Sequence, residues 1–235
     1  MMEGYRTMPI LTYHRIGEPQ HDHVPTVTPE RFERHLAWIA RLRYQVLPFA
    51  QVIERLERGD SLPRRAALIT FDDGYVETAT IAAGALQRFG FPSIVFVTPG
   101  QVGTSGFMSW EQVKGLEATG MAVGSHTLHH TYLPLASRAQ AQQELAESKA
   151  TLEQQLGHAV PWLSYPVGGY TPEVQAVAKA AGYRAACTTN RGVSRRALDL
   201  FALRRIKITE RDQPLSLTVK LSGCYDWFRR IEQPA

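Results

Sequence analysis

Two adjacent carboxylates, Asp72 and Asp73, directly follow an apolar run in residues 68–74 (Leu-Ile-Thr-Phe-Asp-Asp-Gly). Neighbouring residues on an extended strand point to opposite faces, so two carboxylates at its end are placed for two different tasks. One of them can bind a metal ion while the other handles a proton. An Asp-Asp-Gly sequence on its own is typical of a turn, so this interpretation needs support from elsewhere in the chain.

A histidine-rich segment further along the chain supplies that support. Residues 123–130 read Val-Gly-Ser-His-Thr-Leu-His-His, with the imidazoles of His126 and His130 spaced i, i+4. Such pairs are common on solvated surfaces, but this one follows an apolar run, as the carboxylates do. One carboxylate and two histidines make a three-ligand set, and a metal bound by three ligands keeps a position open for water. The combination predicts a hydrolytic metal site.

Both segments resemble motifs of the polysaccharide deacetylases, the carbohydrate esterases that share the NodB-homology domain. Residues 70–74 (Thr-Phe-Asp-Asp-Gly) and 126–130 (His-Thr-Leu-His-His) are similar to the first two motifs of this family. Residues 165–168 (Tyr-Pro-Val-Gly) resemble the Tyr-Pro-x-Gly form of the third motif. Residues 11–16 (Leu-Thr-Tyr-His-Arg-Ile) are similar to a Tyr-His segment that opens one branch of the family. The resemblance extends from residue 9 to residue 207.

The resemblance implies a division of labour between the two carboxylates. Asp73, His126 and His130 would bind a divalent metal, and Asp72 would be the general base that takes a proton from water. Two histidines and a carboxylate suit Zn²⁺ best, although Co²⁺ or Ni²⁺ would also fit. His129 is an alternative to His130 as a ligand. The family spacing His-Thr-x-x-His and the i, i+4 geometry both favour His130.

Further roles carried over from the family concern the proton donor and the oxyanion. His14 would be the general acid that protonates the leaving amine; the alternative is a core histidine hydrogen-bonded to a neighbour. The backbone N–H of Val167, together with the metal, would hold the tetrahedral oxyanion. Tyr165, at the start of the same turn, is expected to contribute to oxyanion or substrate binding.

The chain departs from the family pattern in two places. Ser164 stands where many members have an arginine that orients the catalytic base. Arg204 or Arg205, on a late predicted strand, could replace that arginine; a solvated charge at the barrel end is the alternative. The fourth motif, with its Asp and Trp, is also unmatched, because residues 188–192 read Thr-Thr-Asn-Arg-Gly.

Predicted strands and helices alternate along the chain, which indicates βαβ units and a parallel sheet. We expect strands at residues 8–14, 44–47, 66–71, 93–98, 121–125, 162–165, 183–188 and 201–208. We expect helices that begin at residues 28 and 109 and others at residues 50–58, 75–89, 137–156, 171–182 and 215–231. The candidate residues follow the C-terminal ends of strands, the face that carries active sites in α/β barrels. The family resemblance implies a distorted (β/α)7 barrel of the NodB-homology type.

Composition sets the broad class of the protein. A chain of 235 residues with 44% apolar residues fits one α/β domain spanning residues 1–235. The net charge of +4 comes without a long basic run, so nucleic-acid binding is not expected. Cys187 and Cys224 form neither a disulfide framework nor a metal-ligand spacing.

No apolar run has the roughly 20 residues of a membrane helix. The N-terminus lacks the apolar stretch of a signal peptide, which favours the cytoplasm. Nothing in the sequence indicates an oligomeric state.

These observations favour a metal-dependent hydrolase that removes N-acetyl groups from an N-acetylated sugar or polysaccharide precursor. One alternative is a hydrolase of a non-sugar amide, because the same metal–carboxylate chemistry would serve it. Another is a non-catalytic carbohydrate-binding protein on the same scaffold, against which the complete ligand set argues. Phe107, Trp110 and Tyr170 are candidates to stack on sugar rings, although each could equally be packing.

Overall fold

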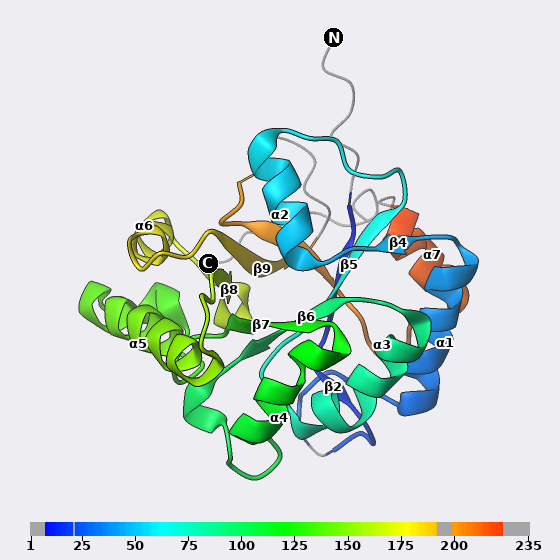
Figure 1. Ribbon diagram of the computed structural model, residues 1–235, viewed down its shortest axis with the longest axis horizontal. Coiled ribbons are helices and arrows are strands. Elements are labelled where there is room, and N and C mark those ends of the chain that lie inside the picture. The colour runs from blue at the N-terminus through cyan, green and yellow to red at the C-terminus, as the bar shows by residue number, and fades with distance from the viewer. Residues whose placement is uncertain (1–7, 21, 192–198, 223–235) are drawn as a thin grey trace.

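The computed structural model describes residues 8–20, 22–191 and 199–222, and within them parallel strands close into a barrel (Figure 1). The ring runs in the order β1-β10-β9-β8-β7-β6-β5 and returns to β1. Its strands are β1 (Ile10–Tyr13), β5 (Ala66–Phe71), β6 (Ser93–Val97), β7 (Met121–Ser125), β8 (Trp162–Ser164), β9 (Ala185–Arg191) and β10 (Leu203–Lys207). The predicted seven-stranded (β/α) barrel is therefore confirmed.

The first strand closes the ring. On one side β1 pairs with β5, with Tyr13 opposite Phe71. On the other side it pairs with β10, with Thr12 opposite Lys207. Three short strands lie outside the ring. β4 (Gln45–Val46) pairs in parallel with the first two residues of β5, and β2 (Arg15–Ile16) pairs with β3 (Thr26–Val27). All six residues of β5 are buried, as expected for a parallel strand covered on both faces.

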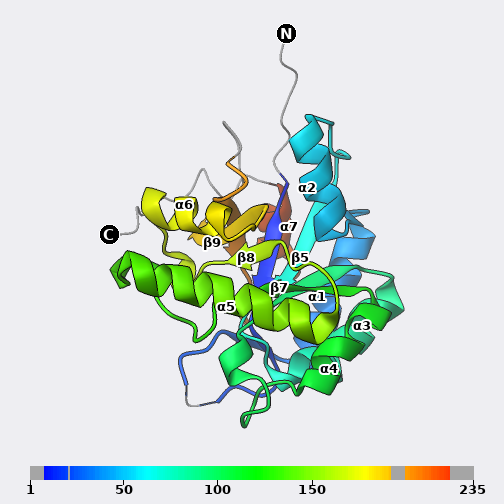
Figure 2. The ribbon, with the colours of Figure 1, turned by 60° about the vertical axis from the view of Figure 1, so that its left-hand side comes forward.

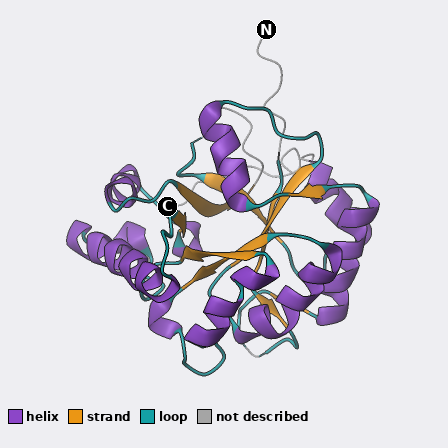
Figure 3. Cartoon of the chain, viewed as in Figure 1, coloured by secondary structure: helices purple, strands orange, loops and turns teal. Residues whose placement is uncertain are grey.

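Helices surround the strands on the outside of the barrel (Figure 3). The described α-helices are α1 (Pro29–Arg41), α2 (Phe49–Arg58), α3 (Ala83–Phe89), α4 (Trp110–Gly115), α5 (Arg138–Leu156), α6 (Pro172–Ala180) and α7 (Pro214–Ser222). The long helix α5 lies beside β7 and β8 (Figure 2). Ser109 and Ser137 form capping boxes at the starts of α4 and α5, and each accepts the backbone N–H of the residue three positions on.

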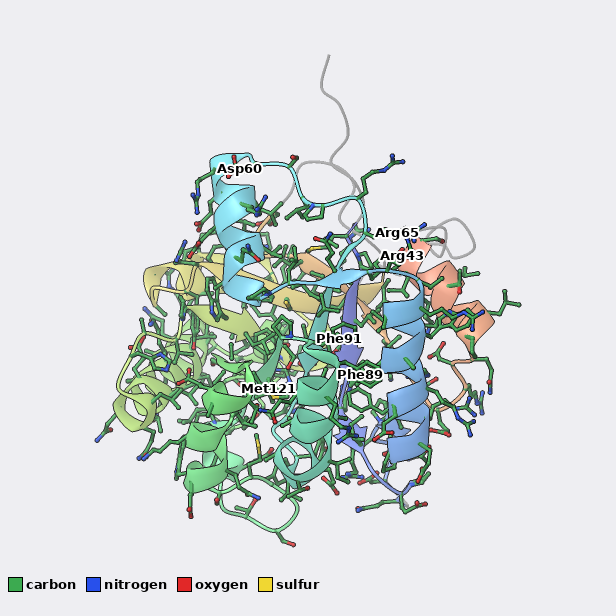
Figure 4. The ribbon with its side chains drawn as sticks, turned by 45° about the vertical axis from the view of Figure 1, so that its right-hand side comes forward. Arg43, Asp60, Arg65, Phe89, Phe91 and Met121 are labelled. Carbon is green, nitrogen blue, oxygen red and sulfur yellow. The ribbon has the colours of Figure 1, made fainter. Side chains whose placement is uncertain are left out.

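The barrel interior is apolar at the N-terminal ends of the strands and polar at their C-terminal ends. Inward-facing residues such as Leu68 and Ile94 form one core with Phe49 and Val52 of α2, which closes the N-terminal end. A second core lies between the sheet and the outer helices α1 and α3. There Phe89 and Phe91 stack at 5.7 Å between ring centroids, and Met121 of β7 is buried in the same core (Figure 4). The polar side chains of the candidate site are therefore confined to one end.

Several predicted elements differ in their bounds. The helix expected at 75–89 begins with a π-helical turn, Thr78–Ala82, before α3. The helix expected at 215–231 is described as far as Ser222, and its remainder and Cys224 lie outside the described residues. Cys187 is buried. In the described ranges, no helix combines the length and apolar character needed to cross a bilayer.

Candidate active site

Five strands deliver the candidate residues to one end of the barrel. His14 follows β1, Asp72 and Asp73 follow β5, and His126 follows β7. The turn that contains Val167 follows β8, and Arg205 lies on β10. Because the carboxyl ends of parallel strands meet at one end of a barrel, these distant segments of sequence converge there.

Asp73, His126 and His130 are grouped as a possible metal site. The Asp73 Oδ1 atom lies 3.4 Å from His126 Nε2 and 3.3 Å from His130 Nε2. One ligand atom from each residue lies within 4.8 Å of the others. The other ring nitrogen of His126, Nδ1, is 2.7 Å from the Ser164 carbonyl oxygen, which orients the ring. Two imidazoles and one carboxylate are the donor set of many zinc sites, so these residues fit a divalent metal.

The backbone at this cluster is unusual. Asp73, Thr127 and His130 have positive φ values of 73°, 63° and 60°. Non-glycine residues rarely adopt this left-handed conformation, and such residues are concentrated at functional sites, where the surrounding structure holds them. Two of the three prospective ligands are thus in a conformation that needs external support.

His129, the alternative ligand, points elsewhere. Its Nδ1 atom is 2.8 Å from Glu144 Oε1 on α5, and its side chain is 63% exposed. The cluster around Asp73 contains His130 and does not contain His129. The structure therefore brings His130 to the site, as the family spacing implies, but residues 126–130 form a non-helical loop, so the helical i, i+4 geometry is not the reason.

Asp72 is held by Arg205 in a fully buried ion pair. The guanidinium Nη1 and Nη2 donate to Asp72 Oδ1 and Oδ2 at 2.7 and 2.6 Å. Nη2 also donates to Ser164 Oγ at 2.9 Å, so the serine found in place of the family arginine contacts its substitute. Burial alone would raise the pKa of Asp72, but Arg205, His126 and His14 together outweigh burial and the pKa is lowered. Of the two arginines considered from sequence, Arg205 orients this carboxylate.

His14 lies across from Asp72 with a free ring nitrogen. The Asp72 N–H donates to the Tyr13 carbonyl oxygen at 3.0 Å, which places His14 beside the carboxylates. The Nδ1 atom of His14 is buried and has no hydrogen-bond partner among the described residues. Burial lowers the pKa of His14, and the charges of Asp72 and Asp73 only partly oppose that effect. A buried nitrogen without a partner is suited to receive one from a bound molecule.

The turn after β8 places a backbone segment at the same end. Val167 has φ 56° and an exposed side chain, within the short helical turn η5 (Pro166–Gly168). A Cβ atom on Gly168 would lie 2.0 Å from Thr189 Oγ1, so only glycine fits there. The Tyr165 side chain, by contrast, is 0% exposed and packs between the sheet and α5 and α6. Its ring therefore has no exposed surface for a substrate to contact. The Tyr165 carbonyl oxygen accepts the Gly168 N–H and so helps to fix the turn that contains Val167.

The aromatic candidates occupy different environments. Phe107 stacks on Tyr75 at 5.0 Å between centroids, and the Arg15 guanidinium lies 4.4 Å from the centre of the Tyr75 ring. Tyr170 stacks on the buried Tyr165 at 5.3 Å. Trp110 packs against the outer core. Sequence reasoning did not single out Glu144, which contacts the histidine segment from α5.

Comparisons with known proteins agree with this geometry. The family model for polysaccharide deacetylases matches residues 59–186. The Bacillus subtilis protein YxkH, whose name assigns it to these deacetylases, is 30% identical over 202 residues, covering 86% of this chain and 71% of its own. A poly-β-1,6-N-acetyl-D-glucosamine N-deacetylase from Escherichia coli is 25% identical over 139 residues, which are 52% of this chain but 21% of that protein.

A solved structure is similar over nearly the whole chain. The Streptococcus pyogenes deacetylase PplD, in complex with acetate, superposes with a TM-score of 0.86 at 26% identity. The match covers 92% of this chain and 98% of PplD. The fold is therefore that of known deacetylases.

Proposed function

The chain belongs to the polysaccharide deacetylase family, and from that premise we propose that it is a metal-dependent hydrolase of N-acetylated sugars. One observation carries the proposal: an Asp–His–His cluster stands next to a second carboxylate that is held by a buried arginine. Holding a metal and accepting a proton are separate tasks in amide hydrolysis, and neighbouring residues are available here for each.

Asp73, His126 and His130 would hold the divalent ion, with Zn²⁺ the best match to the donor set. When bound, such an ion polarises the acetyl carbonyl and lowers the pKa of water. The Ser164 carbonyl oxygen accepts from His126 Nδ1, which leaves Nε2 as the ligand atom beside Asp73. These contacts set the orientation of His126 before any ion arrives.

Asp72 is the proposed general base. Its pKa, lowered by Arg205, keeps the carboxylate ionised at neutral pH and able to accept a proton from water. The bidentate contact with Arg205 also fixes the plane of the carboxylate. Arg205 therefore acts on the reaction through Asp72, as a positioning residue.

His14 and Val167 complete the proposed reaction. His14 would act in its protonated form, which the charges of Asp72 and Asp73 favour, and its Nδ1 would deliver a proton to the leaving amine as the carbon–nitrogen bond breaks. The Val167 N–H, in its left-handed turn, would donate to the oxyanion that forms from the acetyl carbonyl. Tyr165 would support this turn from behind through packing and its carbonyl oxygen.

The relatives suggest the substrate class. The E. coli relative is named for poly-β-1,6-N-acetyl-D-glucosamine, and PplD was solved with acetate, the product that an acetyl hydrolase releases. We therefore propose an N-acetylhexosamine unit within a glycan as the substrate.

The test is acetate release from N-acetylglucosamine oligomers by Zn²⁺-loaded and chelator-treated protein, beside Asp72→Asn and His126→Ala. We expect the chelator and His126→Ala to abolish activity. Asp72→Asn should lower kcat by about 10²–10⁴-fold while metal binding persists. Release that continues in chelator would contradict the metal-dependent mechanism. Release only from non-sugar acetamides would replace the glycan with a small amide as the substrate.

A further inference from the structure

We propose that Glu144, with Ser148 one turn later on α5, is a positioning residue that holds the histidine loop, residues 126–131, in its ligand-binding conformation. The proposal rests on the proposed function, because it assumes that His126 and His130 are metal ligands. It adds a requirement outside the barrel: the affinity for the metal depends on a helix that supplies no ligand.

Glu144 accepts hydrogen bonds from two groups of His129 in this loop. Its Oε2 atom accepts the backbone N–H of His129 at 2.9 Å, and Oε1 is 2.8 Å from His129 Nδ1. Glu144 is buried at 9% exposure, whereas Glu147 on the same helix is exposed. A carboxylate that accepts both from the backbone and from the ring of His129 restrains the backbone directly before His130.

Ser148 holds the other end of the loop. Its hydroxyl lies 2.7 Å from the Ser125 hydroxyl, and both side chains are buried. Ser125 Oγ in turn accepts the backbone N–H of Thr127 at 3.3 Å. Glu144 and Ser148 are spaced i, i+4, so they share one face of α5. That face therefore contacts the histidine loop at both ends.

The loop needs such restraint because of its backbone. Thr127 and His130 both have left-handed φ values, which are unfavourable for residues with a side chain. Without Glu144, the amide of His129 loses a charged acceptor, and the loop can relax toward ordinary φ values. Relaxation would carry His130 Nε2 away from Asp73, to which it now lies at 3.3 Å.

The experiment compares Glu144→Ala and Glu144→Gln with the matched control Glu147→Gln. Zn²⁺ affinity is measured by competition with a chromophoric chelator, and folding by circular dichroism. We expect Glu144→Ala to weaken Zn²⁺ binding about 10-fold, the lower end of the loss seen when a metal ligand loses its own hydrogen-bond partner, because Glu144 acts on His130 through the neighbouring His129. Glu144→Gln retains an acceptor oxygen, so its Zn²⁺ affinity should lie between those of Glu144→Ala and the wild type. The Zn²⁺ affinity of Glu147→Gln should match that of the wild type.

Hydrogen exchange of the metal-free proteins provides a readout that needs no ion. Faster exchange in residues 126–131 of Glu144→Gln, but not of Glu147→Gln, would support the proposal. Unchanged exchange, or Zn²⁺ affinity within twofold of wild type for Glu144→Ala, would overturn it. Zn²⁺ affinity and hydrogen exchange do not measure catalysis, so they test the role of Glu144 separately from the proposed function. A wild type that binds Zn²⁺ yet releases no acetate would contradict the proposed function alone.

Discussion

At the scale of single residues, the Asp72 carboxylate is held in place by a buried ion pair. Both of its oxygens accept from Arg205, and neither side chain is appreciably exposed. A buried pair of this kind stabilises the fold only while both partners are present, since removing one leaves an unpaired charge. The same contact that orients the base therefore also makes the barrel end depend on Arg205.

Arg205→Met should raise the pKa of Asp72, because the arginine makes the largest of the contributions that oppose burial. We expect the acidic limb of the kcat/KM profile to move to higher pH and the stability at pH 7 to fall by about 3–5 kcal/mol. In the wild type the folded-state pKa lies below the unfolded value of about 3.9. The stabilisation is therefore complete above that pH and is lost as the pH falls through the folded-state pKa. Chemical denaturation across this window and pH–rate profiles measure both effects.

Arg204→Met is the matched control for this substitution. Arg204 precedes Arg205 on β10, where side chains alternate between the two faces, and it is only partly buried. It should leave the acidic limb unchanged. An equal shift in both variants would show that general loss of positive charge, and not the contact with Asp72, sets the profile.

At the scale of elements, the turn after β8 shows how a backbone conformation depends on its surroundings. Gly157, at the end of α5, and Gly168, in the turn, have nearly the same φ, 79° and 77°. A Cβ atom would meet nothing within 4 Å at Gly157, but at Gly168 it would lie 2.3 Å from the Thr189 backbone nitrogen. The two positions share a conformational requirement and differ in packing.

Gly157→Ala should cost about 1 kcal/mol from the left-handed conformation alone, with activity unchanged. Gly168→Ala should cost more, because the turn must move away from Thr189. That movement displaces the Val167 N–H, so we expect kcat to fall by at least tenfold, as when an oxyanion donor is lost. Urea denaturation and acetate release measure the two effects. Full activity in a folded Gly168→Ala protein would contradict a role for this turn in catalysis.

At the scale of the molecule, barrel closure brings together residues from both ends of the described sequence. His14 follows β1 and Arg205 lies on β10, and these two strands pair directly. The prospective ligands come from the loops after β5 and β7, so a bound ion would link separate parts of the ring. Because the ligand atoms meet only in the folded protein, metal binding and folding should be coupled.

Zn²⁺ at 100 times its Kd should stabilise the protein by about 2.7 kcal/mol. For a chain of this size, that corresponds to a rise in Tm of about 5–10 °C over the chelator-treated protein. His130→Ala should remove most of the rise. The exposed His158 contacts Glu117 outside the site, so His158→Ala should keep the full response. A rise that survives in His130→Ala would place the stabilising ion elsewhere.

The sequence by itself determined the alternation of strands and helices, and with it the barrel. Apolar runs are local features, and they predicted most elements to within a few residues. The family motifs, which are also short stretches of sequence, predicted the two histidines that now surround Asp73, although in a loop and not on a helix. These predictions succeeded because each depends on neighbours in the chain.

Only the tertiary structure decided which side chains meet across the barrel. Arg204 and Arg205 are equivalent in sequence, but the alternation of faces on β10 directs Arg205 inward to Asp72. Tyr165 stands in a motif expected to bind substrate, yet its ring, directly after β8, packs into the core beneath α5 and α6. Glu144 had no local pattern at all. Its role follows from how α5 packs on the histidine loop, and packing between distant segments is not encoded in any short stretch of sequence.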